Sequence, residues 1–152
     1  MADKALMLNI GCGMRQIEDW FNLDDLPYPG LDLVHDLMDT PWPLTDECAV
    51  RAMAHHAIGR VVRARYGLLR FMNEVHRLLR PGGEFLIVAP YGMNQAFLQD
   101  PTFCTPVTEA TFYHFDPEHK SGLWQRYQPK PWRIAHLAWD VVSILEVTLV
   151  RR

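Results

Sequence analysis

Short apolar runs open the chain, and each ends at glycines or acids. Leu6, Met7, Leu8 and Ile10 form a run typical of a buried central strand, and Gly11 and Gly13 follow it at once. Glycines at such a point let backbone N–H groups approach a ligand closely. The pattern therefore predicts a ligand-binding loop after the first strand, although an ordinary tight turn can use the same two glycines.

The middle and the end of the chain predict the rest of an α/β fold. Residues 66–80 carry apolar side chains at helical spacing and predict an amphipathic crossover helix. Pro81, Gly82 and Gly83 are expected to stop this helix, and residues 83–90 to follow as a buried parallel strand. Residues 132–139 and 142–150 predict two strands around Asp140, which close the sheet as an antiparallel pair.

The connections between the first three strands are short. Residues 11–19 separate the first strand from the second, and residues 25–30 separate the second from the third. A full parallel crossover usually needs at least about 10 to 12 residues, so at least one usual helix is expected to be missing and the pocket to be open. An uncovered apolar sheet face needs another chain against it, which predicts a homo-oligomer or a partner subunit.

Composition and charge narrow the class of protein. A chain of 152 residues with 49% hydrophobic residues forms one domain with a core. Its apolar runs are far shorter than the roughly 20 residues of a membrane helix and no signal-like start is seen, so we expect a cytoplasmic protein without a membrane partner. An acidic segment over residues 16–47 and an arginine-rich one over 51–80 indicate solvated faces, and nucleic acid is an unlikely partner. Cys12, Cys48 and Cys104 lack metal spacing and predict free, buried thiols.

Acids follow two further apolar runs. Residues 20–23 stop at Asp24 and Asp25, and residues 31–35 stop at Asp36. Ligands bind at the carboxyl ends of parallel strands, where a carboxylate can accept hydrogen bonds from ribose hydroxyls or an adenine amino group. We therefore expect a nucleoside ligand, with Asp24 at the ribose, Asp25 as the alternative, and Asp36 at the adenine.

At these residues the sequence resembles the class I S-adenosylmethionine-dependent methyltransferases, especially the small type 11 kind. The similar segments are LNIGCG at 8–13, DLVHDL at 32–37, LLRPGGEFLIVAPY at 78–91 and DPTFCTPVTEATFYHFDPEH at 100–119. The resemblance implies a Rossmann-like methyltransferase fold, a mostly parallel sheet with an antiparallel C-terminal strand and abbreviated helices. It further implies a single domain over 1–152, with a cofactor half at 1–90, an acceptor-side insertion at 91–131 and C-terminal strands at 132–152.

The resemblance also implies S-adenosylmethionine as cofactor and a methyl acceptor that is a small molecule or a macromolecule. The expected cofactor contacts are Asn9, Gly11, Cys12, Gly13, Asp24, Asp25, Asp36, Leu37 and His55. The candidate acceptor-side groups are His55, His56, Tyr91, Asp100, His114 and, beside the last, Tyr113. Methyl transfer needs a general base only if the nucleophile is protonated. His114, Asp116 and His119 are too few for a metal site, so no metal is predicted.

The acceptor half departs from the family pattern. Where similar proteins commonly have a His-x-x-Glu-His-like segment, this chain keeps His56 but has Gly59 and Arg60. Where they have a His and an Arg in the insertion, it has Phe103 and Thr105. A catalytically degenerate module that acts by binding a partner is therefore the alternative to an enzyme. A dinucleotide-dependent oxidoreductase is disfavoured, because the loop lacks a third glycine and a full helix to hold pyrophosphate.

Overall fold

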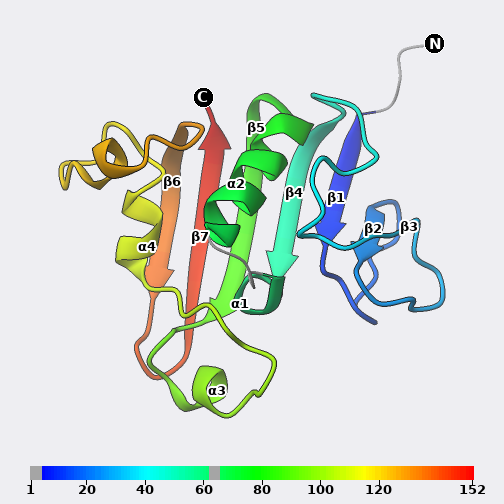
Figure 1. Ribbon diagram of the computed structural model, residues 1–152, viewed down its shortest axis with the longest axis horizontal. Helices are drawn as coiled ribbons and strands as arrows, with labels where there is room; N and C mark the ends of the chain where they lie inside the picture. The colour runs from blue at the N-terminus through cyan, green and yellow to red at the C-terminus, as the bar shows by residue number, and fades with distance from the viewer. Residues whose placement is uncertain (1–4, 62–65) are drawn as a thin grey trace.

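A twisted sheet runs through the whole molecule (Figure 1). The computed structural model describes residues 5–61 and 66–152, which form a seven-stranded sheet in the order β3-β2-β1-β4-β5-β7-β6. The strands are β1 (Leu6–Ile10), β2 (Phe21–Asp24), β3 (Leu33–Val34), β4 (Ala49–His55), β5 (Leu79–Pro90), β6 (Trp132–Trp139) and β7 (Ile144–Arg151). Neighbours from β3 to β5 are parallel, and β7 is antiparallel to both β5 and β6. The predicted fold class is confirmed.

The helices are few and mostly short. They are α1 (Ile58–Val61), α2 (Gly67–Leu78), α3 (Gln95–Leu98), α4 (Glu109–Tyr113) and the 3-10 helix η1 (Leu123–Arg126). The predicted crossover helix is α2, but its expected stop at Pro81-Gly82-Gly83 is wrong. Leu79 is already extended, with φ −77° and ψ 146°, and it pairs with Ala49 of β4. The Pro-Gly-Gly segment forms a bulge inside β5 before Glu84 resumes the pairing opposite Arg51.

The core lies between α2 and one face of the sheet. Alternate residues of β5 and β7, among them Phe85, Ile87 and Val147, are fully buried on that face. Phe71 of α2 packs on Phe85, with ring centroids 6.3 Å apart. The loop after β3 adds Trp42, whose ring lies 5.9 Å from that of Phe71. This irregular loop therefore covers the sheet where a crossover helix would usually lie.

Two asparagine side chains hold the loop that connects β1 to β2, a described segment in which no helix forms. Asn9 and Asn22 are opposite each other in the parallel ladder, and the Asn9 amide donates to the Asn22 side chain at 2.9 Å. Asn9 also donates to the Arg15 carbonyl, and Asn22 both accepts from and donates to the backbone of Ile17. These bonds hold loop 11–20 in place without helical structure, so the predicted abbreviation of the crossovers agrees with the fold.

The opposite face of the sheet has little cover. In Figure 1 the helices α1, α2 and α4 lie on the viewer's side of the sheet. On the far side, Met53, Leu86 and Thr148 form one row across β4, β5 and β7, and all three are partly exposed. Arg51 and Glu84 form an ion pair at 2.8 Å on the same face, with both side chains about half exposed. Within the described ranges, no helix is long and apolar enough to span a bilayer.

Candidate functional site

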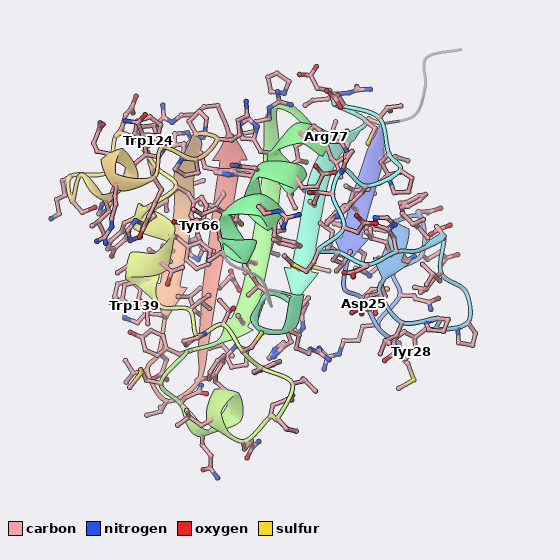
Figure 2. The ribbon with its side chains drawn as sticks, in the orientation of Figure 1. Asp25, Tyr28, Tyr66, Arg77, Trp124 and Trp139 are labelled. Carbon is pink, nitrogen blue, oxygen red and sulfur yellow. The ribbon has the colours of Figure 1, made fainter. Side chains whose placement is uncertain are left out.

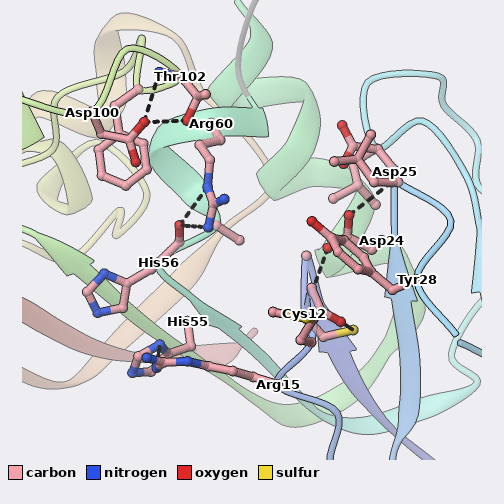
Figure 3. A pocket seen from close by; sticks show the side chains of 17 residues that line it. Cys12, Arg15, Asp24, Asp25, Tyr28, His55, His56, Arg60, Asp100 and Thr102 are labelled. Atoms are coloured by element: carbon pink, nitrogen blue, oxygen red, sulfur yellow. Dashed lines mark hydrogen bonds between the residues drawn. The ribbon is translucent and has the colours of Figure 1, made fainter. Parts of the chain in front are cut away.

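A cavity of about 580 Å³ opens at the carboxyl ends of β1, β2 and β4 (Figure 3). Its lining contains most of the residues that the sequence predicted, which are Gly11, Cys12, Gly13, Asp24, Asp25, Leu37, His55, His56 and Asp100. Figure 2 shows Asp25 and Tyr28 at the end of the molecule that carries β2 and β3. The volume falls in the range of about 300 to 1,000 Å³ that is usual for small-molecule sites.

The glycine loop forms the floor of this cavity. Gly11 and Gly13 have φ of +64° and +54°, in the left-handed region that favours glycine. A Cβ on Gly11 would lie 2.5 Å from the Cβ of Ala57, so this position also needs glycine for space. The Gly11 N–H donates to the Leu23 carbonyl at 2.8 Å, which keeps the loop against β2. The loop therefore lines the cavity and is tied to β2 by this hydrogen bond.

Asp24 joins this loop to the end of β2. Its Oδ2 accepts from the Gly13 N–H at 2.7 Å, and its Oδ1 accepts from the Leu26 N–H at 3.0 Å. The Asp24 side chain lies at the cavity although the residue is only 6% exposed. Asp25, next in the chain, is exposed and also lines the cavity. Carboxylate oxygens can accept more than one hydrogen bond, so both acids remain candidates for ribose hydroxyls.

Arg15 and His55 form the far end of the cavity. Arg15 Nη1 lies 3.0 Å from His55 Nδ1, and because a guanidinium only donates, His55 must accept there. This contact makes His55 a neutral imidazole with its proton on Nε2. Burial, followed by the charge of Arg15, lowers the pKa of His55. The sequence prediction missed Arg15, although a basic residue two positions after the second glycine was a usable signal.

His56 lies beside His55 in a strained backbone conformation. Its φ is +56°, and its ring centroid lies 4.3 Å from that of His55. Burial lowers the pKa of His56, and the charges of Arg15 and Arg60 lower it further. Such backbone strain at a non-glycine residue is typical of functional sites. His56 is therefore a neutral imidazole near pH 7, as a general base must be.

The acceptor-side wall is built from α1 and the loop after α3. The Gly59 carbonyl accepts from the N–H groups of Cys104 and Thr105, at 2.9 and 3.2 Å. Phe103 of this loop packs on Phe97, with ring centroids 5.5 Å apart. Asp100 accepts from the backbone and the hydroxyl of Thr102, and these bonds lower the pKa of its carboxyl. The insertion thus lies at the carboxyl end of the sheet and brings Asp100 to the same cavity as His56.

Four predicted residues lie outside the lining of this cavity. Asn9 is buried beneath loop 11–20, and Asp36 is exposed, with its carboxylate accepting from the Met38 N–H at 2.8 Å. The Tyr91 hydroxyl donates to Glu109 at 2.7 Å, and this bond raises the Tyr91 pKa. His114 packs near Tyr127, with ring centroids 5.8 Å apart. Their functional roles stay predictions.

Tyr113 and the three cysteines are the remaining residues that the sequence analysis singled out. Tyr113 stacks on His119, with centroids 3.9 Å apart, beside a separate hollow near β6. All three cysteines are free, as predicted, but only Cys12 is buried, and Cys104 is exposed. Burial raises the pKa of the Cys12 thiol to about 11, so this thiol is protonated at neutral pH. Cys12 therefore acts in the loop as a small neutral side chain.

The comparisons with known proteins support the same fold. No protein-family model matches the sequence, and no curated protein matches it. The structure is similar to an S-adenosylmethionine-dependent methyltransferase from Methanosarcina mazei, at 14% identity over 99% of this chain and 94% of that chain, with a TM-score of 0.68. A second such enzyme, from Mesorhizobium loti, has 15% identity over 99% and 94% of the two chains and a TM-score of 0.64.

A further similar structure comes from a complex. It is that of the Haloferax volcanii Trm112 methyltransferase activator with a methyltransferase, at 15% identity over 96% of this chain and 82% of that chain, with a TM-score of 0.63. At these identities the likeness concerns the fold. The chain therefore has the Rossmann-like fold of the class I S-adenosylmethionine-dependent methyltransferases.

Proposed function

We propose that this protein is an S-adenosylmethionine-dependent methyltransferase. The observation that carries the proposal is the contact between Asp24 and Gly13, which places an acid from β2 and the glycine loop from β1 at one cavity. A nucleoside with an amino-acid extension fits such a site, because the acids can accept from ribose hydroxyls while the loop backbone borders the amino-acid part. The fold of the similar methyltransferases supports this assignment.

The chemistry follows from the residues around the cavity. When bound, S-adenosylmethionine supplies an electrophilic methyl group on a sulfonium. His56 then takes the proton from an acceptor atom that carries one, because its neutral imidazole has a free lone pair. We expect the wall formed by α1 and loop 100–105 to orient the acceptor. Alignment within about 3 to 3.5 Å of the reacting carbon supplies much of the acceleration.

Calorimetry tests the cofactor assignment. S-adenosylhomocysteine should bind the purified protein with measurable heat, whereas NAD and buffer should not. An absence of heat and of any thermal shift at millimolar S-adenosylhomocysteine would overturn the proposed function. Heat with NAD alone would instead support the oxidoreductase that the sequence disfavours.

A second experiment tests catalysis itself. The protein is incubated with S-adenosylmethionine labelled in the methyl group and with extracts of metabolites, RNA and protein, and label is followed into each fraction. Transfer that falls in the His56→Ala variant supports an enzyme and tells whether the acceptor is small or macromolecular. Tight cofactor binding without transfer in any fraction would support the degenerate binding module.

We also propose that a second copy of the chain covers the open face of the sheet. Parallel sheets occur almost only with both faces covered, and here Met53, Leu86 and Thr148 lie in a partly exposed row. The similar methyltransferase that was solved with a protein activator supports the idea that this fold works with a partner. A cytoplasmic location remains an expectation from the sequence.

A further inference from the structure

We infer that the methyl acceptor is a small molecule with an anionic group, a carboxylate or a phosphate, and that Arg60 pairs with this group. The inference rests on the proposed function, since it names the class of acceptor for the same cavity. It depends on how Arg60 is held, on which partners it has and on what surrounds it.

The Arg60 guanidinium is fixed at the cavity by its own neighbours. Nε and Nη2 of Arg60 both donate to the His56 carbonyl, at 3.3 and 3.1 Å. The guanidinium carbon lies 5.7 Å from the centre of the Phe103 ring, which supports it from one side. Figure 3 shows the guanidinium of this arginine beside the backbone oxygen of His56, across the view from Asp24 and Cys12. A guanidinium has five N–H donors, so the bonds to His56 leave others for a ligand.

The partners of Arg60 differ from those of the structural arginines. Arg77, Arg151 and Arg152 each form an ion pair with a carboxylate, at distances from 2.5 to 3.5 Å. Among the described residues, no carboxylate lies within 4.0 Å of the Arg60 guanidinium. Asp100 acts on Arg60 only at longer range, and one oxygen of its carboxylate accepts two bonds from Thr102. Arg60 is thus an oriented cation with room for an anionic partner.

The charges that line the cavity are mixed. Arg15 and Arg60 line it, and so do the carboxylates of Asp24, Asp25 and Asp100. The inference therefore rests on Arg60 itself, whose guanidinium donates to a neutral carbonyl. A guanidinium binds a carboxylate or a phosphate through two parallel hydrogen bonds, so either group of the acceptor fits this partner.

The position of Arg60 also relates the anion to the proposed base. Because the His56 carbonyl holds the guanidinium, an anion on Arg60 lies near the His56 side of the cavity. Phe103, which is partly exposed and lines the cavity, offers an apolar surface for the body of the same molecule. An acceptor whose anionic and nucleophilic groups are joined by a short apolar or aromatic body therefore matches this wall.

Three probe molecules of similar shape test the inference. Benzoate, phenyl phosphate and the neutral benzamide are titrated into the protein saturated with S-adenosylhomocysteine, and binding is followed by ligand-observed NMR. We expect at least one of the two anions to bind tenfold or more tightly than benzamide. The comparison of benzoate with phenyl phosphate tells which anionic group the site prefers.

Variants show whether Arg60 is the partner. Arg60→Gln should remove the preference for anions, and Arg60→Lys should keep part of it, because the charge remains while the paired donors are lost. Arg51→Gln is the matched control, since Arg51 pairs with Glu84 on the opposite face, and this variant should leave probe binding unchanged. Melting temperatures confirm that each variant is folded.

The outcomes separate this inference from the proposed function. If S-adenosylhomocysteine binds but benzamide binds as well as both anions, or if Arg60→Gln keeps the preference, the anionic acceptor is wrong and the cofactor assignment stands. If S-adenosylhomocysteine does not bind, the proposed function fails. The titrations of the ligand-free protein then still measure whether Arg60 binds anions.

Discussion

The carboxylate of Asp24 accepts a hydrogen bond from the backbone N–H of Gly13 at 2.7 Å. This contact joins the loop after β1 to the end of β2 across 11 positions of sequence. The described residues between these strands form no crossover helix. The Asp24 carboxylate therefore stabilises the loop in addition to its proposed contact with the ligand.

Asp24→Ala should therefore reduce both stability and affinity. The variant leaves the N–H groups of Gly13 and Leu26 without their acceptor, at a cost of roughly 1 to 3 kcal/mol. Chemical denaturation and calorimetry with S-adenosylhomocysteine measure the two effects. Asp25→Ala is the control, and if it weakens binding more than Asp24→Ala does, the ribose contact belongs to Asp25.

Gly11→Ala should destabilise the protein more than Gly122→Ala. Both glycines have similar φ, +64° and +67°, so alanine meets a comparable backbone cost of about 1 to 2 kcal/mol at each. The new Cβ has no heavy atom within 4 Å at Gly122, whereas at Gly11 it would lie 2.5 Å from Ala57. The clash adds a cost of about 1 to 3 kcal/mol. Equal melting temperatures for the two variants would show that the loop shifts to accommodate the new Cβ at little cost.

Gly11→Val extends this test to function. The larger side chain should displace the loop from α1 and abolish binding of S-adenosylhomocysteine, which thermal-shift assays and calorimetry detect. A folded Gly11→Val variant with normal affinity would mean that the loop does not border the ligand.

Arg15→Gln should weaken the binding of S-adenosylhomocysteine but not that of 5′-methylthioadenosine. We expect Arg15 to pair with the carboxylate of the cofactor, because it follows the glycine loop and lines the cavity. The second ligand lacks the amino-acid part, so calorimetry with both isolates this contact. Arg60→Gln is the control and should not change the ratio of the two affinities. Equal losses for both ligands would contradict the assignment.

The buried His76 predicts a pH dependence of stability. Burial lowers its pKa from 6.5 to about 4, while its Nε2 donates to the Pro131 carbonyl at 3.1 Å. The unfolded chain therefore takes up the proton first, and stability falls as the pH drops from 6.5 towards 4, by up to about 3 kcal/mol. Above pH 6.5 this contribution is constant.

His76→Gln provides the comparison, because glutamine can donate to the same carbonyl but does not titrate. Urea denaturation at pH 7 and pH 4.5 measures the free energy of unfolding of both proteins. Between these pH values the wild type should lose more stability than the variant. A difference between the two proteins that does not vary with pH would show that the pKa of His76 is the same in the folded and the unfolded chain.

Self-association should depend on the open face of the sheet. Leu86→Lys places a charge in the middle of the row formed with Met53 and Thr148, so it should convert a dimer to a monomer in light scattering after size-exclusion chromatography. Leu98→Lys is the control, because Leu98 is 70% exposed and lies on α3. A wild-type protein that stays monomeric at high concentration would rule out the dimer.

The sequence by itself determined the fold class and the cofactor end of the cavity. The apolar runs are strong local signals, and parallel strands bring their carboxyl ends to one edge, so Gly11, Gly13 and Asp24 could be placed together before the fold was known. The end of α2 at Leu78 could not be predicted from the sequence. Leu79 is extended because it pairs with Ala49, which lies far away in the sequence.

Only the tertiary structure decided the acceptor end. The predicted His56 and Asp100 line the cavity, but Tyr91 and His114, which have suitable chemistry, lie outside its lining, whereas Arg60 and Phe103 lie within it. Loop 100–105 is positioned by hydrogen bonds to the Gly59 carbonyl, some 45 residues earlier in the chain. Long-range backbone contacts of this kind leave no periodic pattern in the sequence. The side chains that they bring together are therefore known only once the chain is folded.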